Sequence, residues 1–320
     1  MTAYLLRRVL LSVLTLWAIS LLAFALLRMA PGDAVTAALA VAPGEGGLSQ
    51  AQIDQRRRDL GLDRSALAQY LDWLGRAVRF DAGRSLSSGE PVVEMVRSRV
   101  AVTVELATLG LVLAAAAGFG GGLLTAAYPG RPVDNALRVL TLLGLSTPAF
   151  WLGLLLIVGV ASWTGYFLAG RYEPFGDAPV ANLEAMLPAA AVLALRPAAL
   201  LLRIVRASTL EATGARFFLL ARLKGVSRMK ATAVHALRVS ALPALTVLGA
   251  QAVFLLGGAV VVEQVFGLPG VGRALVDAVL SRDFPVVQAL LLLFGGIALG
   301  INLLLDLLYV RLDPQIRVTA

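Results

Sequence analysis

Long apolar runs alternate with charged segments along the whole chain. The first extends from Val9 to Leu27 without a charge, and five more follow at 106–128, 139–170, 187–205, 239–262 and 284–305. A helix of about 20 apolar residues is long enough to cross the hydrocarbon layer of a bilayer. The pattern therefore predicts an all-α integral membrane protein with six transmembrane helices. The fourth run is interrupted by Arg196 and Pro197.

The first apolar run predicts a retained helix, within residues 1–30, rather than a cleaved signal peptide. Arg7 and Arg8 precede it, as they would in a signal peptide. The apolar core of a signal peptide is shorter, about 7–15 residues, and it ends at a small-residue cleavage site. Here Arg28 and Pro31-Gly32-Asp33 follow instead.

The segment at 31–99 is polar and separates the first two predicted helices. It contains a predicted helical patch at 49–60 and nothing long enough to span a bilayer. A lobe of this size has only a thin core of its own. We therefore expect it to lean on the membrane domain or on a partner.

Glycine and proline predict local features of two apolar runs. Four glycines, at 118, 120, 121 and 122, lie in the second run. Glycine at this density permits close approach between helices. Pro148 lies in the third run, where it is expected to kink the helix.

Composition and charge agree with a membrane protein whose ends lie inside the cell. Of the 320 residues 58% are hydrophobic and 15% charged, and the net charge is +8. Apart from the segment at 33–99, basic residues are concentrated near both termini, at 131–138 and at 203–238. The segment at 33–99 is also rich in arginine, but segments of that length translocate regardless of charge. The positive-inside rule then places both termini and the loop at 206–243 in the cytoplasm. The absence of cysteine excludes disulfides and thiolate metal sites, and a single histidine excludes a multi-histidine metal site.

The cytoplasmic loop predicts a docking element for another protein. Phe217, Phe218, Leu219 and Leu220 lie among its basic residues, which makes the segment amphipathic. Glu211, near its start, is its single acid and is expected to stabilise a helix N-terminus. Gly225 can adopt the left-handed conformation that ends a helix, and Ser227 can cap the next one. The pattern predicts a short helix, a tight turn and a second helix running to Pro243.

Several motifs of this chain resemble the permeases of ABC importers, in the branch that imports dipeptides, oligopeptides and nickel chelates. The loop motif is Ala-Arg-Leu-Lys-Gly at 221–225, followed by His-Ala-Leu-Arg at 235–238 and Pro243. Further matching motifs keep the family's order at 31–33, 61–86, 145–151, 257–273 and 306–317. The chain departs from the family at 80–83, at 217–220 and at Gln315.

The resemblance implies the type I ABC importer permease fold, with an extracytoplasmic insert between helices 1 and 2. The implied organisation is an N-terminal transmembrane helix (1–30), the insert (31–99) and the importer transmembrane domain (100–320) with a coupling loop at 206–243. The implied location is the bacterial cytoplasmic (inner) membrane.

The implied function is that of a non-catalytic permease subunit, forming half of the translocation pathway for peptides or a similar small solute delivered by an extracytoplasmic solute-binding protein. Nickel chelates, opines and oligosaccharides are alternative cargoes. The implied partners are a second homologous permease, giving a heterodimer, and two ABC ATPase subunits. A phosphate-binding loop needs Gly-Lys-Ser/Thr, and neither Lys224 nor Lys230 lies in one. The chain is therefore expected to hold no cofactor, and ATP and magnesium are expected on the ATPases.

Candidate site residues follow from the loop and from charges at membrane depth. The residues expected to couple to the ATPase are Glu211, Phe217, Phe218, Ala221, Arg222, Lys224, Gly225, His235 and Arg238. The candidates for the translocation path or gate are Arg196, Glu263 and Pro148.

Each membrane candidate has a structural alternative. A charge inside a membrane normally faces a cavity or a partner. Arg196 either meets an anionic group of the substrate, pairs with an acid on the second permease, or extends to the membrane interface. Glu263 and Asp283 are expected to flank an outer loop, and an ordinary solvated cap is the favoured role for Asp283.

Two other classes of protein fit the chain less well. A secondary transporter normally carries an acidic or histidine relay in its spans, and these spans have none. An intramembrane serine hydrolase needs histidine at membrane depth, whereas His235 lies in the cytoplasmic loop. Either class would be favoured if the purified chain moved or cleaved a substrate without an ATPase.

Overall fold

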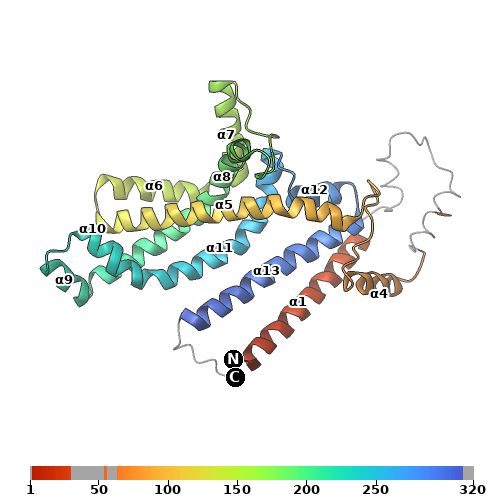
Figure 1. Ribbon diagram of the computed structural model, residues 1–320, viewed down its shortest axis with the longest axis horizontal. Helices are drawn as coiled ribbons and strands as arrows, with labels where there is room; N and C mark the ends of the chain where they lie inside the picture. The colour runs from red at the N-terminus through yellow and green to blue at the C-terminus, as the bar shows by residue number, and fades with distance from the viewer. Residues whose placement is uncertain (1, 30–53, 56–62, 313–320) are drawn as a thin grey trace. The chain divides into compact units, whose positions relative to one another are not determined.

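The computed structural model in Figure 1 describes residues 2–29, 54–55 and 63–312, and their regular elements are helices. Most of the predicted helical patch at 49–60 lies outside these residues. The helices are α1 (Thr2–Met29), α4 (Ala66–Ala77), α5 (Val92–Ala127), α6 (Pro132–Ser146), α7 (Ala149–Thr164), α8 (Pro179–Thr213), α9 (Arg216–Leu223), α10 (Arg228–Ala231), the π-helix η1 (Thr232–Ala236), α11 (Leu237–Phe266), α12 (Val271–Leu280) and α13 (Phe284–Leu312).

The described residues contain five helices that are long and apolar enough to cross a membrane: α1, α5, α8, α11 and α13. A sixth span is obtained if α6 and α7 are counted together. These two helices are bent by 108° at a short break. The change of direction expected at Pro148 is therefore present, but it is a break between two helices and not a kink within one. Thr147 is extended, at φ −93° and ψ 130°, because a residue before proline avoids the α conformation, and Pro148 then starts α7 from its N-cap.

Two other predicted boundaries change because helices continue through proline. α8 has 35 residues and includes Pro188 and Pro197, and α11 includes Pro243 and runs on to Phe266. Neighbouring helices and local adjustments re-satisfy the backbone groups that proline leaves unpaired in a membrane helix. The second helix of the cytoplasmic loop therefore does not end at Pro243. Glu263 lies inside α11 rather than in an outer loop.

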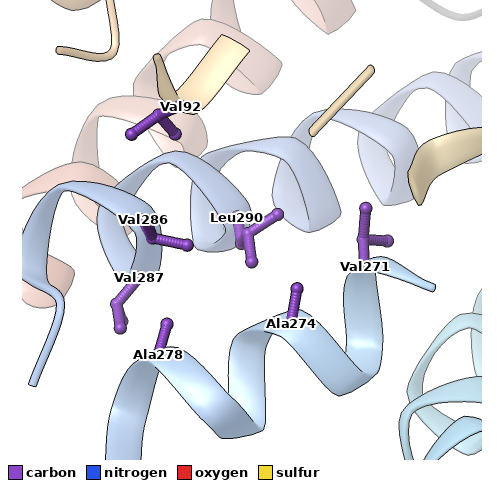
Figure 2. Close-up of a cluster of buried hydrophobic side chains, with 7 residues drawn as sticks. All are labelled: Val92, Val271, Ala274, Ala278, Val286, Val287 and Leu290. Carbon is purple, nitrogen blue, oxygen red and sulfur yellow. The ribbon is translucent and has the colours of Figure 1, made fainter. Parts of the chain in front are cut away.

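The described residues divide between two compact units, one built from 2–29, 54–55, 63–102 and 269–303 and the other from 103–268 and 304–312. The core of the first unit joins α12 to the start of α13 (Figure 2). Residues 271, 274 and 278 recur at the spacing that places them on one face of α12. The cluster consists of Val92, Val271, Ala274, Ala278, Val286, Val287 and Leu290.

The second unit contains the glycine-rich part of α5. A Cβ added to Gly118 would lie 2.7 Å from the side chain of Leu201, and one added to Gly122 would lie 2.7 Å from that of Val205. Leu201 and Val205 are themselves fully buried on α8. The prediction of close helix packing is confirmed for Gly118, Gly121 and Gly122, whereas a Cβ at Gly120 would meet no atom within 4 Å.

Candidate functional site

A helix, a left-handed turn and a second short helix follow the end of α8. Gly225 has a φ of +82°. Its N–H and that of Val226 donate to the carbonyls of Arg222 and Ala221, at 3.0 and 3.2 Å, which ends α9 in the manner of a glycine C-cap. Ser227 Oγ accepts from the N–H of Lys230 at 3.4 Å at the start of α10. This part of the loop prediction is confirmed.

The inner face of the turn is a small apolar cluster. Phe218, Ala221 and Ala231 are buried there, with Val226 packed against them. Arg222 Nη1 donates to the carbonyl of Val226 at 2.6 Å. Three residues predicted to contact an ATPase, Phe218, Ala221 and Arg222, therefore hold the turn together.

The outer face of α9 carries the residues that the sequence reasoning missed. Leu219, Leu220 and Leu223 are 61%, 57% and 75% exposed. They lie opposite Phe218 and Ala221 because one turn of an α-helix takes 3.6 residues. The spacing of the apolar residues within 216–223 is the signal that would have separated the two faces. Arg216 and Lys224 are exposed at the two ends of the helix.

The other predicted loop residues are placed as follows. Glu211 is exposed in the last turn of α8, so its predicted place at a helix N-terminus is wrong. Phe217, His235 and Arg238 belong to α9, η1 and α11 respectively. The side chains of these three lie outside the described part of the structure.

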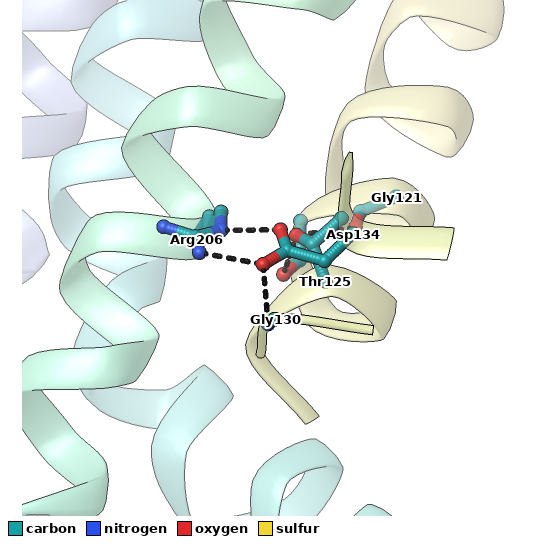
Figure 3. A network of polar contacts seen from close by, with 6 residues as sticks. Gly121, Thr125, Gly130, Asp134 and Arg206 are labelled. Carbon is teal, nitrogen blue, oxygen red and sulfur yellow. Dashed lines mark hydrogen bonds and ion pairs between the residues drawn. The ribbon is translucent and has the colours of Figure 1, made fainter. Parts of the chain in front are cut away.

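An ion pair with a buried carboxylate joins Arg206, near the end of α8, to Asp134 of α6 (Figure 3). The carboxylate of Asp134, which is 1% exposed, accepts hydrogen bonds of 2.9 Å from Nε and Nη2 of Arg206 and from the N–H of Gly130. The pair fixes the turn between α5 and α6 to α8, ten residues before α9 begins. In the sequence Arg206 is one of several basic residues at 203–238, and nothing nearby points to Asp134 as its partner.

The acidic membrane candidates are buried and hydrogen-bonded. Glu263 has no exposed surface, and it accepts a hydrogen bond from Thr103 Oγ1 at 2.5 Å. Asp283 is 2% exposed. It accepts from the N–H groups of Leu86 and Ser87 and from the hydroxyls of Ser85 and Ser87. The expectation that Asp283 is a solvated cap is therefore wrong, because its carboxylate is buried and anchors the turn at 85–87.

The segment between α7 and α8 is fixed close to Glu263. The N–H of Gly170 donates to the carbonyl of Phe266 at 2.8 Å, and the Tyr172 hydroxyl donates to Glu105 on α5 at 3.4 Å. Burial, together with the adjacent Glu105 carboxylate, raises the pKa of Tyr172 above its usual value of 10.0.

Arg196 is exposed on α8 and lies against an aromatic ring of α11. Its guanidinium carbon is 4.7 Å from the ring centroid of Phe254, which is itself 45% exposed. This is the geometry of a cation–π contact. Pro148, the remaining membrane candidate, lies at the break between α6 and α7.

The chain is similar over its full length to bacterial transport proteins. A family model described as "Binding-protein-dependent transport system inner membrane component" matches residues 118–318, and an N-terminal model of the same kind of component matches residues 1–107. A putative peptide transport system permease protein of Brucella abortus (strain 2308) is 36% identical over 317 residues, 99% of each chain. The dipeptide transport system permease protein of Escherichia coli (strain K12) is 38% identical over 344 residues, again 99% of each chain.

Proposed function

The chain belongs to the family of binding-protein-dependent transport system inner membrane components, and on that premise we propose that it forms half of the membrane pathway of a peptide importer of the ABC type. The relatives named above are called peptide and dipeptide permeases and match the chain from end to end. Uptake of a labelled dipeptide into cells that lack other peptide importers tests the cargo. Uptake of a nickel chelate, without uptake of the dipeptide, would overturn the proposed peptide cargo.

The proposed subunit works with partners that hydrolyse ATP and deliver the substrate. The partners are two ATPase subunits, a second homologous permease and a solute-binding protein. The observation that supports coupling to an ATPase most directly is the exposed outer face of α9. Three adjacent leucines flanked by basic side chains, on a short helix supported by its own small core, suit a groove on another protein.

A pair of matched variants tests the coupling surface. Leu223→Gln removes an apolar contact from α9, and Leu280→Gln removes an equally exposed leucine from α12. Both should reach the membrane at the parental level, because neither side chain is buried. Only Leu223→Gln should lose co-purification with the ATPase and transport-linked ATP hydrolysis. Parental coupling in Leu223→Gln, or equal losses in both variants, would overturn the role proposed for α9.

Gly225 tests whether the turn must be rigid to present that face. No atom lies within 4 Å of the position that a Cβ would occupy, so a substitution there is penalised by the backbone conformation and not by crowding. Gly225→Val should weaken coupling, whereas Gly225→Asn should retain most of it because asparagine tolerates positive φ. Equal coupling in the two variants would contradict the role of the turn.

The proposed orientation places both termini and α9 in the cytoplasm. The chain has no cysteine, so single cysteines at Ser88 and Ser227 report directly on sidedness. Membrane-impermeant thiol reagents should label them from opposite faces. Labelling of both from one face would contradict the topology.

A further inference from the structure

α4 carries two apolar faces, of which the described structure covers one. Tyr70 and Trp73 form the buried face and are 6% and 9% exposed. The second face, which we call the α4 stripe, consists of Leu67, Leu71, Leu74 and Val78. These residues recur at i, i+4, i+7 and i+11, the spacing of a single helical face. Leu67, Leu71 and Val78 are 67%, 57% and 73% exposed.

The buried face of α4 is fixed to the C-terminal part of α1. The Tyr70 hydroxyl is 2.9 Å from Ser20 Oγ, and its ring meets Phe24 edge-on at 5.4 Å between centroids. Arg28 Nη1 donates to Gln69 Oε1 at 2.8 Å. These contacts join one turn of α4 to two turns of α1. These contacts therefore fix the position of α4 along α1.

That level lies near the end of the apolar window of α1, where a membrane-spanning helix reaches the membrane interface. The apolar window of α1 extends from Leu6 to Leu26. Ser20 lies six residues inside its end, about 9 Å at the rise of an α-helix. Helices that lie in the plane of a bilayer surface bury their apolar face to a similar depth, about 5–10 Å. At this level, the α4 stripe would be surrounded by lipid.

The remaining side chains around α4 match such a position. Asp72 and Arg76 form an exposed ion pair at 3.4 Å on the side away from the stripe. Phe80, just beyond the helix, is 89% exposed, and aromatic rings are enriched at membrane interfaces. Leu67 also lines a cavity of about 370 Å³ between α1 and α4, together with Leu21, Phe24 and Arg28. Through this cavity the stripe adjoins the surface of α1 at Leu21, which is itself 42% exposed.

We propose that α4 is an interfacial helix whose stripe lies among the lipids at the C-terminal end of α1. The occupant of the stripe is the bilayer itself, at the boundary between headgroups and acyl chains. The proposal assigns a membrane-binding surface to the polar segment between the first two membrane helices. It depends on α1 spanning the membrane, and on neither the substrate nor the sidedness.

A cysteine scan from 67 to 80 tests the proposal on the full chain in lipid nanodiscs. Each single cysteine carries an environment-sensitive fluorophore. The quenching of its emission is measured with nitroxide-labelled phosphatidylcholine, a lipid quencher, and separately with iodide, an aqueous quencher. Leu71→Cys is the test position, and Asp72→Cys, on the polar side, is its matched control. Both replaced side chains are exposed, so neither variant should disturb the fold.

The expected result is a helical periodicity in lipid quenching, with maxima at 67, 71, 74 and 78. At Leu71 lipid quenching should exceed that at Asp72 several-fold, and iodide quenching should show the reverse. Iodide quenching at Leu71 equal to that at Asp72 would overturn the proposal, because the stripe would then face water. Shielding of Leu71 from both quenchers would overturn it as well, because a protein surface would then cover the stripe.

Discussion

The carboxylate of Asp134 and the guanidinium of Arg206 form a bidentate ion pair, with both hydrogen bonds at 2.9 Å. Asp134 is 1% exposed at the start of α6, and the Arg206 side chain is 24% exposed near the end of α8. The pair therefore links the α5–α6 turn to the helix that leads into α9.

Removing one member of this pair should destabilise the protein more than removing both. Arg206→Leu leaves a buried carboxylate without its counter-ion, a cost of about 3–5 kcal/mol. In the double variant Asp134→Asn/Arg206→Leu no charge remains to be buried, so part of the loss should be recovered. Thermal unfolding of the purified chain in detergent measures both. Arg76→Gln, which breaks an exposed pair, is the control and should cost about 1 kcal/mol or less. Equal effects of Arg206→Leu and Arg76→Gln would contradict the structural role of the pair.

The glycines of α5 provide a second matched comparison. A Cβ at Gly122 would lie 2.7 Å from the Val205 side chain and 3.1 Å from the backbone carbonyl oxygen of Leu202, whereas one at Gly120 would meet no atom within 4 Å. Gly122→Ala should therefore destabilise the protein by about 1–3 kcal/mol through overpacking. Gly120→Ala should be neutral or slightly stabilising, since alanine is the better helix former. Thermal unfolding distinguishes the two variants. Equal unfolding midpoints in Gly122→Ala and Gly120→Ala would show that α5 and α8 do not pack closely at Gly122.

Asp283 should be intolerant of even an isosteric amide. One of its carboxylate oxygens accepts from the N–H of Leu86 and the other from the N–H of Ser87. Asparagine would therefore place its NH₂ group against a backbone N–H in either orientation, at a cost of about 1–3 kcal/mol. Hydrogen exchange at Leu86 and Ser87 should become faster in Asp283→Asn. Asp277 is an exposed acid on the same unit, so the control variant Asp277→Asn should leave that exchange unchanged. Unchanged protection of Leu86 and Ser87 in Asp283→Asn would contradict the anchoring role.

Apolar periodicity and turn chemistry were enough to predict most of the fold. Five of the six predicted spans coincide with long helices, and the left-handed turn at Gly225 was predicted correctly. Both features depend on local properties of the chain. The effects of proline depended on context: Pro148 precedes a 108° break, whereas Pro197 and Pro243 lie inside continuous helices. Whether proline breaks a helix or is accommodated within it depends on tertiary packing, which cannot be inferred from the proline and its sequence neighbours.

The polar contacts were much harder to predict because they join residues far apart in the chain. Asp134 and Arg206 are separated by 72 positions, and Ser85 and Asp283 by 198. Their sequence surroundings are those of ordinary loop charges. The two faces of α9, by contrast, follow from helical spacing alone. The roles of Arg196, Glu263 and Pro148 in a translocation path remain predictions.

Arg196 offers the sharpest test of that path. A charge at the bilayer centre costs about 2.5–3.5 kcal/mol on insertion scales, and the contact with Phe254 offsets only part of this. If Arg196 meets the carboxylate of a peptide, Arg196→Leu should be at least as abundant in the membrane while import falls. The loss should be smaller for a C-terminally amidated peptide, which lacks that carboxylate. Phe254→Leu keeps the charge and removes the ring, so it should impair import less.

A structural arginine predicts a different outcome on the same samples. If Arg196 pairs with an acid on the second permease, Arg196→Leu leaves that acid buried and uncompensated, a penalty of several kcal/mol. The heterodimer should then dissociate, and free and amidated peptides should lose import equally. Heterodimer yield and uptake, measured together, separate the two cases. An intact heterodimer with unchanged uptake would contradict both and would leave Arg196 with the Phe254 contact alone.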